Sequence, residues 1–295
     1  MSYTLKADEW LDDGLRRIVQ AQSQIILEGL ARTDEPHKGL YEARKAFKRL
    51  RALLRLVRTS IGEVAYHRAN ERLRRCANDL APARDGYVVA QSLAAHLAKL
   101  DNPAPYQAVH QRWLAEADAQ LAAVLSDPDL RQRLSDDLEV LGHEADEWRL
   151  WPRDGFALVA ADLRATYRAG RRTMKALQAR PDSSPEAFHE WRKRVKRLWY
   201  HLTLFRELEG LEALIQQADD LGEQLGLAHD QVVLEAKLRQ QPEDLRALIA
   251  MAQVEARRLE QEALSLGAAL YAQRPNEFLA RMWMRFAVWR ARRAA

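Results

Sequence analysis

The chain of 295 residues is rich in Ala, Leu, Arg and Glu, contains only 12 Gly, and has a net charge of +4. This composition predicts an all-α protein, because strands joined by tight turns need more glycine. The single cysteine, Cys76, excludes an intrachain disulfide, and no apolar run is long enough for a membrane helix. Because the N-terminus lacks a signal-peptide pattern, we expect a cytoplasmic protein without a membrane partner.

Helical spacing of apolar residues predicts a first helix from Asp8 to Leu30. A break at Thr33–Pro36 precedes a strongly basic helix that we expect to end near Thr59. Glycine and proline signals then divide helices predicted over about 62–80, 84–100, 105–125 and 128–146. The segment 149–155, which contains Pro152 and Gly155, is the predicted central linker.

The second half repeats this plan. Its helices are predicted over about 156–179, 185–207, 209–225, 228–240, 243–273 and 275–292. We therefore interpret the chain as a single domain of two pseudo-symmetric helical bundles, residues 1–148 and 149–295, with about six helices each.

Two sequence echoes support an internal duplication. The run YEARKAFKRLR (residues 41–51) aligns with HEWRKRVKRLW (residues 189–199), with Tyr41 at the position of His189. The run LAPARDGYVV (residues 80–89) aligns with LGLAHDQVV (residues 225–233). Because both echoes occur in the same order at nearly the same separation, we expect two homologous halves.

The duplicated helix is unusually basic. Residues 37–58 contain eight Lys and Arg against one carboxylate, and residues 188–206 contain six against one, so the rest of the chain is net negative. On a helix that advances about 100° per residue, Lys48, Arg51 and Arg55 fall within about 40° of Arg44. Like charges one turn apart repel, so the stripes predict an anionic partner rather than a solvated face alone.

Cations spaced one helical turn apart suit a linear polyanion better than one compact phosphate. The sequence has no Gly-rich phosphate loop with its lysine and Ser/Thr, so it lacks the motif for P-loop nucleotide hydrolysis. It also shows no nucleophile and base arrangement, and we expect neither an enzyme nor a bound cofactor or metal.

With these paired motifs, the chain resembles the CHAD domain (conserved histidine α-helical domain) over nearly its whole length. The resemblance implies two helical bundles whose basic residues line a central groove or channel that binds inorganic polyphosphate without catalysis. It also implies an association with polyphosphate granules, which some members of the family show. The polyphosphate ligands implied by matching positions are Arg44, Lys45, Lys48, Arg49, Arg51, His189, Arg192, Lys193, Lys196 and Arg197.

Other positions are less directly implied. Arg55 extends the first stripe by its spacing, and Arg168 and Arg172 resemble basic residues that the family carries on the preceding helix. Tyr41 departs from the family pattern, which has a histidine at this position. One turn earlier His37 projects on the same side, at about 20° from Arg44, and we hypothesise that it substitutes for that histidine.

Three alternatives remain at this point. A basic stripe can bind a nucleic-acid backbone or another polyanion, with an affinity that falls with salt. The His229-Asp230 dipeptide could ligate a metal in a phosphohydrolase, although its counterpart Arg84-Asp85 could not. The stripes could also dock an acidic partner surface. For Asp85 and Asp230 we expect an orienting role toward neighbouring cations or helix ends.

Overall fold

The computed structural model describes residues 3–148, 150, 155–180 and 183–292, and in these residues it contains helices and no strands. The all-α prediction is confirmed. None of the helices in the described part combines the length and apolar character that a bilayer crossing requires. In chain order the helices are α1 (Leu11–Ala31), α2 (Pro36–Leu56), α3 (Arg58–Ile61), α4 (Glu63–Asp79), α5 (Ala81–Leu97), α6 (Ala104–Ser126), α7 (Pro128–Asp146), α8 (Ala157–Gln178), α9 (Pro185–Leu204), α10 (Glu212–Leu238), α11 (Arg246–Leu270) and α12 (Pro275–Ala291).

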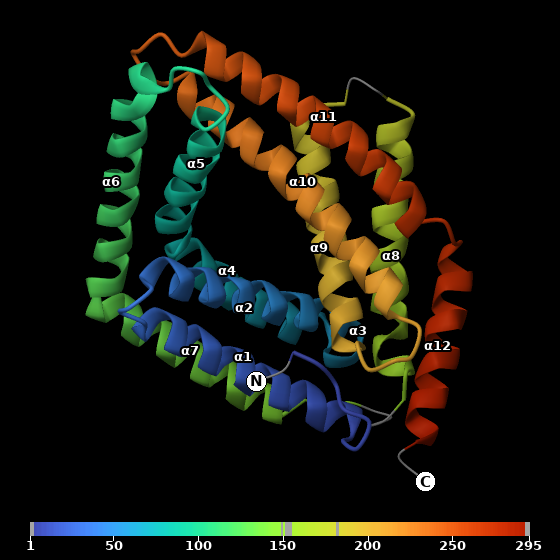
Figure 1. The fold of residues 1–295 in the computed structure, drawn as a ribbon. Coiled ribbons are helices and arrows are strands. Elements are labelled where there is room, and N and C mark those ends of the chain that lie inside the picture. Colours follow the sequence, from blue (N-terminus) through green and yellow to red (C-terminus); the bar gives the residue numbers. More distant parts are fainter. Residues whose placement is uncertain (1–2, 149, 151–154, 181–182, 293–295) are drawn as a thin grey trace.

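The helices form the sides of a four-sided frame (Figure 1). The first side contains α1, α2, α4 and α7, and the second contains α5 and α6. The third side is the antiparallel pair α10 and α11, and the fourth contains α8 and α9 with α12 outside them. Helices α2, α5, α9 and α10 are the inner members, and α2 contacts both α5 and α9.

Helix boundaries agree with the prediction except at three places. The basic helix ends at Leu56 and a short α3 follows it, and the linker predicted at 149–155 lies mostly outside the described residues. The helices predicted over 209–225 and 228–240 form one continuous helix, α10, so the predicted break near Gly226 is wrong. Gly226 lies inside α10 on the side that faces α9, where a Cβ would be 3.5 Å from Nε of Arg192, so it is a packing position and not a helix end.

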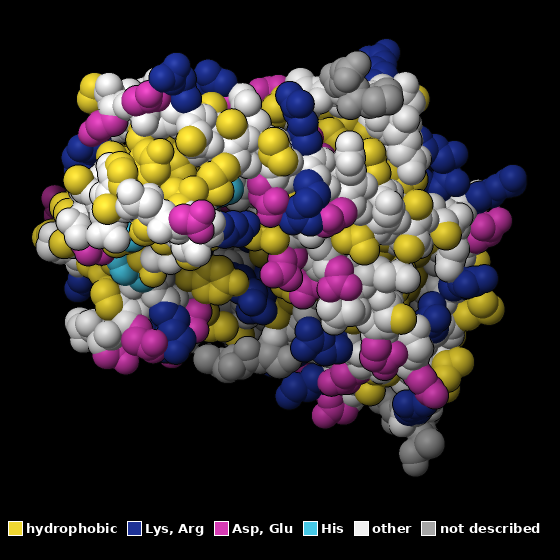
Figure 2. All heavy atoms as spheres, turned by 45° about the horizontal axis from the view of Figure 1, so that its top comes forward, with side chains coloured by type: hydrophobic (Ala, Val, Ile, Leu, Met, Phe, Trp, Pro, Cys, Tyr) yellow, Lys and Arg dark blue, Asp and Glu magenta, His cyan; other side chains and the backbone are white. Residues whose placement is uncertain are grey.

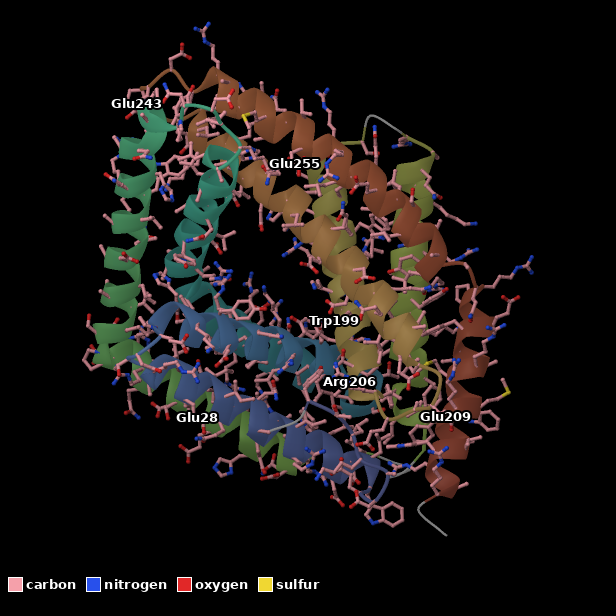
Figure 3. All side chains as sticks on the ribbon, in the orientation of Figure 1. Glu28, Trp199, Arg206, Glu209, Glu243 and Glu255 are labelled. Atoms are coloured by element: carbon pink, nitrogen blue, oxygen red, sulfur yellow. The ribbon has the colours of Figure 1, made fainter. Side chains whose placement is uncertain are left out.

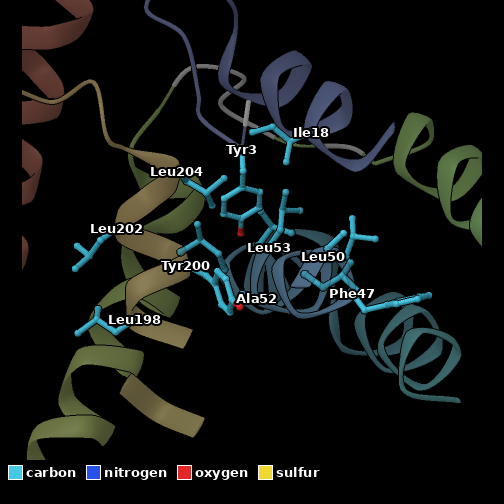
Figure 4. Packing of buried hydrophobic residues seen from close by; sticks show 14 of the residues in the cluster. Tyr3, Ile18, Phe47, Leu50, Ala52, Leu53, Leu198, Tyr200, Leu202 and Leu204 are labelled. Carbon is cyan, nitrogen blue, oxygen red and sulfur yellow. The ribbon is translucent and has the colours of Figure 1, made fainter. Parts of the chain in front are cut away.

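The two basic helices are anchored by one continuous core. Tyr3 of the N-terminal segment packs edge-on against Tyr200 of α9 and lies near Leu53 of α2 (Figure 4). The backbone N–H of Leu5 donates to the carbonyl of Leu204, and the Tyr3 hydroxyl donates to the carbonyl of Arg49. The N-terminal segment therefore ties the end of α9 to α2.

A buried histidine also joins α2 to α9. Nε2 of His201 donates to the carbonyl oxygen of Ala52 over 2.8 Å. Burial lowers the pKa of His201 to about 3, so the ring stays neutral at physiological pH. A neutral donor satisfies the Ala52 carbonyl without placing a further charge in the core.

Candidate functional site

A cavity of about 710 Å³ lies among the four inner helices α2, α5, α9 and α10. Figure 3 shows their side chains projecting into the space within the frame, with Trp199 labelled at its margin. The polar and aromatic residues of its wall are Tyr41, Arg44, Lys45 and Lys48 of α2, Arg84 and Asp85 of α5, His189, Arg192, Lys196, Trp199 and Tyr200 of α9, and Asp219, Glu223, His229 and Asp230 of α10.

The cavity brings together charged residues from both halves of the chain. Of the ligands predicted from the sequence, six line it: Arg44, Lys45, Lys48, His189, Arg192 and Lys196. On the outer face seen in Figure 2, by contrast, Lys and Arg are interspersed with Asp and Glu. The cavity thus gathers cations of α2 and α9, which are far apart in the sequence, at the inner side of the frame.

Lys48 is at the centre of this charge. Its side chain is solvent-exposed, and the partial desolvation of its ammonium by the surrounding protein is the largest cause of a pKa lowered to about 8. The cations of Arg192, Arg44, Arg84 and Lys196 lower it further. These groups belong to α2, α5 and α9, so three helices direct like charges toward one point.

Two carboxylates orient cations of the wall. Asp85 of α5 lies 3.3 Å from a guanidinium nitrogen of Arg44, and Asp219 of α10 lies 3.3 Å from Nζ of Lys196. The orienting role predicted for Asp85 agrees with this contact. Burial raises the pKa of Asp230, against the opposing effect of Arg192, Arg84 and Lys48.

The indole ring of Trp199 lies beside two lysines of the wall. Nζ of Lys196 lies 4.4 Å from the centre of its indole ring, and Nζ of Lys45 lies 5.9 Å from it. Both contacts are in the range of cation–π attraction. The indole thus holds one ammonium from each basic helix beside the cavity.

Four predicted ligands lie outside the cavity wall. Arg49 donates to Gln22 and lies over the ring of Tyr3. On the side of α4, Arg51 donates to Asn70 and Arg55 donates to the hydroxyl of Tyr66. The fourth is Arg197. Burial is the largest cause of its lowered pKa, and the nearby charges of Arg55 and Arg51 lower it further.

The remaining predicted ligands also face elsewhere. Lys193 is paired with Glu190 over 2.6 Å, and Arg168 and Arg172 are exposed on α8. The ring of His37 stacks on Tyr87, with 3.9 Å between centroids, and its Nε2 lies 2.8 Å from Asp118. Two cations lie over the ring of Tyr41: the guanidinium of Arg84 is 5.7 Å from its centre, and Nζ of Lys45 is 5.8 Å from it.

Several wall residues were not among the predicted ligands. Arg84 and His229 occupy matching positions in the second sequence echo. That echo indicated a duplicated element, but it did not show that this element faces the basic stripes. Asp219 and Glu223 belong to neither echo, and Trp199, which ends the run HEWRKRVKRLW, was not predicted as a ligand. In the described residues no group of three His, Cys, Asp or Glu side chains is arranged to hold a metal ion.

Comparisons with known proteins agree with this architecture. The CHAD domain family model matches residues 15–239. The crystal structure of the CHAD domain from the plant Ricinus communis is similar, with a TM-score of 0.70 and 21% identity over 92% of this chain and 95% of that chain. PptA from Streptomyces chartreusis is similar with a TM-score of 0.60 and 16% identity over 90% of this chain and 100% of that chain.

At these identities the two structures are evidence for the fold alone. A search of curated proteins found no significant match. Because the family model extends over most of the chain, from α1 to the end of α10, the protein belongs to the CHAD domain family.

Proposed function

We propose that the protein binds inorganic polyphosphate in the cavity and does not catalyse a reaction on it. The observation that carries the proposal is the surroundings of Lys48, where Arg192, Arg44, Arg84 and Lys196 all act on one ammonium. Within the described residues, no carboxylate lies within ion-pair distance of Lys48. The free protein therefore keeps a repulsion that a bound anion would relieve.

The arrangement of the cations favours a linear polyanion. On α2 and on α9, cavity cations are one turn apart, which is about 5.4 Å along the helix axis. Arginine offers a fork of donors and lysine a compact charge, and both suit phosphate oxygens. A chain of phosphates in the cavity would bind cations of α2 and α9 at the same time, whereas a single phosphate would contact only a few of them.

Nucleic acid fits the same wall less well. Proteins that bind single strands stack bases on free aromatic faces. Here the ammoniums of Lys196 and Lys45 lie over Trp199, the largest aromatic side chain of the wall. Membership of the CHAD family supports polyphosphate, and by the same resemblance we propose a cytoplasmic protein that associates with polyphosphate granules.

The proposal predicts saturable binding of long-chain polyphosphate that weakens with salt. Counterion release from several neutralised phosphates should lower the affinity on the order of 100-fold between 50 and 200 mM KCl. Titration calorimetry at pH 7 measures this directly. Absence of saturable binding at low salt would overturn the proposal, and steady release of inorganic phosphate would contradict its non-catalytic part.

A further inference from the structure

The wall of the cavity contains a pair of stacked histidines. The rings of His189 on α9 and His229 on α10 are 4.0 Å apart between centroids and inclined at 32°. In the alignment of the two halves, Tyr41 takes the position of His189 and Arg84 that of His229, and these two are also in contact. One half thus places a permanent cation on an aromatic ring where the other half places two imidazoles.

The surroundings of both imidazoles favour the neutral ring in the free protein. Partial burial lowers the pKa of His189, and the charges of Lys193 and Arg192 lower it further. Burial also lowers the pKa of His229 to about 4, and His189, Arg192 and Lys193 add to this effect. A neutral imidazole contributes no positive charge, so this part of the wall lacks the cation that Arg84 supplies in the other half.

In the free protein, few carboxylates act on the two rings to favour their protonation. Glu190 is the one carboxylate among the described residues that raises the pKa of His189, and it is already paired with Lys193. No group of α11, which packs on α10, acts on either ring in the described part of the chain. The other charged groups that line the cavity are Arg44, Lys45 and Lys48 of α2, Arg84 and Asp85 of α5, Lys196 of α9, and Asp219, Glu223 and Asp230 of α10.

We propose that the stacked His189 and His229 pair takes up a proton from solution when a polyanion occupies the cavity. This inference rests on the proposed binding of polyphosphate. Phosphate oxygens beside the rings stabilise an imidazolium, which then adds a cation to the wall at the position where Arg84 stands in the other half. Two imidazolium rings at stacking distance repel each other, so the pair takes up about one proton rather than two.

The direction in which affinity changes with pH follows from the protonation of the histidine pair in the bound and in the free protein. The bound pair holds its proton up to a higher pH than the free pair, so bound protein carries more protons in the interval between the two pKa values. Affinity therefore rises as pH falls through that interval, by at most about tenfold per pH unit for one proton. Above the interval both states are neutral, and affinity no longer depends on this pair.

Lys48 does not obscure this signal. Its pKa of about 8 means that polyanion binding would also protonate Lys48, but only near or above pH 8. Between pH 5.5 and 7 the groups that binding can protonate are the two histidines and Asp230, whose pKa is raised by burial. The histidine variants below keep Asp230, so the proton uptake that they lose is that of the histidines. Long chains are needed as the probe, because their terminal phosphates, which titrate near neutral pH, are then a small fraction of the ligand.

The test is titration calorimetry of the full chain with long-chain polyphosphate at pH 6, in two buffers of different ionisation enthalpy. We expect uptake of about one proton per binding event, and an affinity about 3- to 10-fold higher at pH 6 than at pH 7. The double variant His189→Tyr/His229→Arg copies the Tyr41 and Arg84 pair of the first half. It should still bind, but without proton uptake and with an affinity that is flat over this range.

His67→Gln is the matched control, because His67 is exposed on α4, outside the cavity, and its loss should leave proton uptake unchanged. If the double variant fails to fold, His189→Gln/His229→Gln removes both titrating groups without adding charge. Binding by the wild type without proton uptake, or uptake that persists in the variants, would overturn the inference and leave polyphosphate binding intact. No binding by the wild type would overturn both.

Discussion

The double variant Lys48→Gln/Lys196→Gln should bind long-chain polyphosphate about 10²- to 10⁴-fold more weakly than the wild type. A hydrogen bond to a charged group contributes about 1.5–3 kcal/mol, so each single variant should lose about 10- to 100-fold. The losses should multiply in one class of sites, because Lys48 of α2 and Lys196 of α9 line the same cavity. Titration calorimetry of the four proteins gives the affinities and the stoichiometry together.

A matched control separates position from net charge. Lys38→Gln/Lys175→Gln removes two exposed cations outside the cavity, from α2 and α8, and should change the affinity much less. An equal loss in this control would mean that binding reports total charge rather than the cavity. If each cavity variant instead removed one of two independent classes of sites, α2 and α9 would bind separate chains, contrary to the account.

Gly39→Ala should lower the free energy of unfolding by about 2–3 kcal/mol, within the usual range for overpacking. A Cβ at Gly39 of α2 would lie 2.2 Å from the carbonyl oxygen of Gly29 on α1. Because the obstructing atom belongs to a helix backbone, it cannot rotate away as the end of a side chain could. Urea denaturation monitored by far-UV circular dichroism measures the change.

Gly142→Ala is the corresponding control, since a Cβ at this position of α7 meets nothing within 4 Å. There the better helix propensity of alanine should raise the stability by about 0.5–1 kcal/mol. If Gly39→Ala were as stable as the wild type, α1 would be free to move away from α2. The tight contact would then not fix the position of the basic helix.

The helices of this fold could be predicted because their apolar periodicity and their proline and glycine signals are strong. Gly226 was misread as a helix break, since a local pattern cannot distinguish a glycine that ends a helix from one on which another helix packs. The structure places it inside α10, and the guanidinium of Arg192 is close to where its Cβ would be.

The candidate site could be predicted in part. Periodicity identified the cationic stripe of α2, but it could not show that Arg44 and Lys48 line the cavity while Arg51 and Arg55 lie outside it and reach polar side chains of α4. Which side of a stripe becomes a cavity depends on where the neighbouring helices cross it. The stacking of His189 on His229 likewise depends on the packing of α9 against α10, which no local motif encodes.

The most direct test of the account is competition for the cavity at fixed salt and matched phosphate concentration. Fluorescently labelled long-chain polyphosphate is displaced from the protein by unlabelled polyphosphate, pyrophosphate, single-stranded DNA or duplex RNA. The account predicts that unlabelled long chains compete at least about tenfold better per phosphate than either nucleic acid, and that pyrophosphate competes weakly. Equal competition by DNA would contradict it, because the cavity would then select for charge alone.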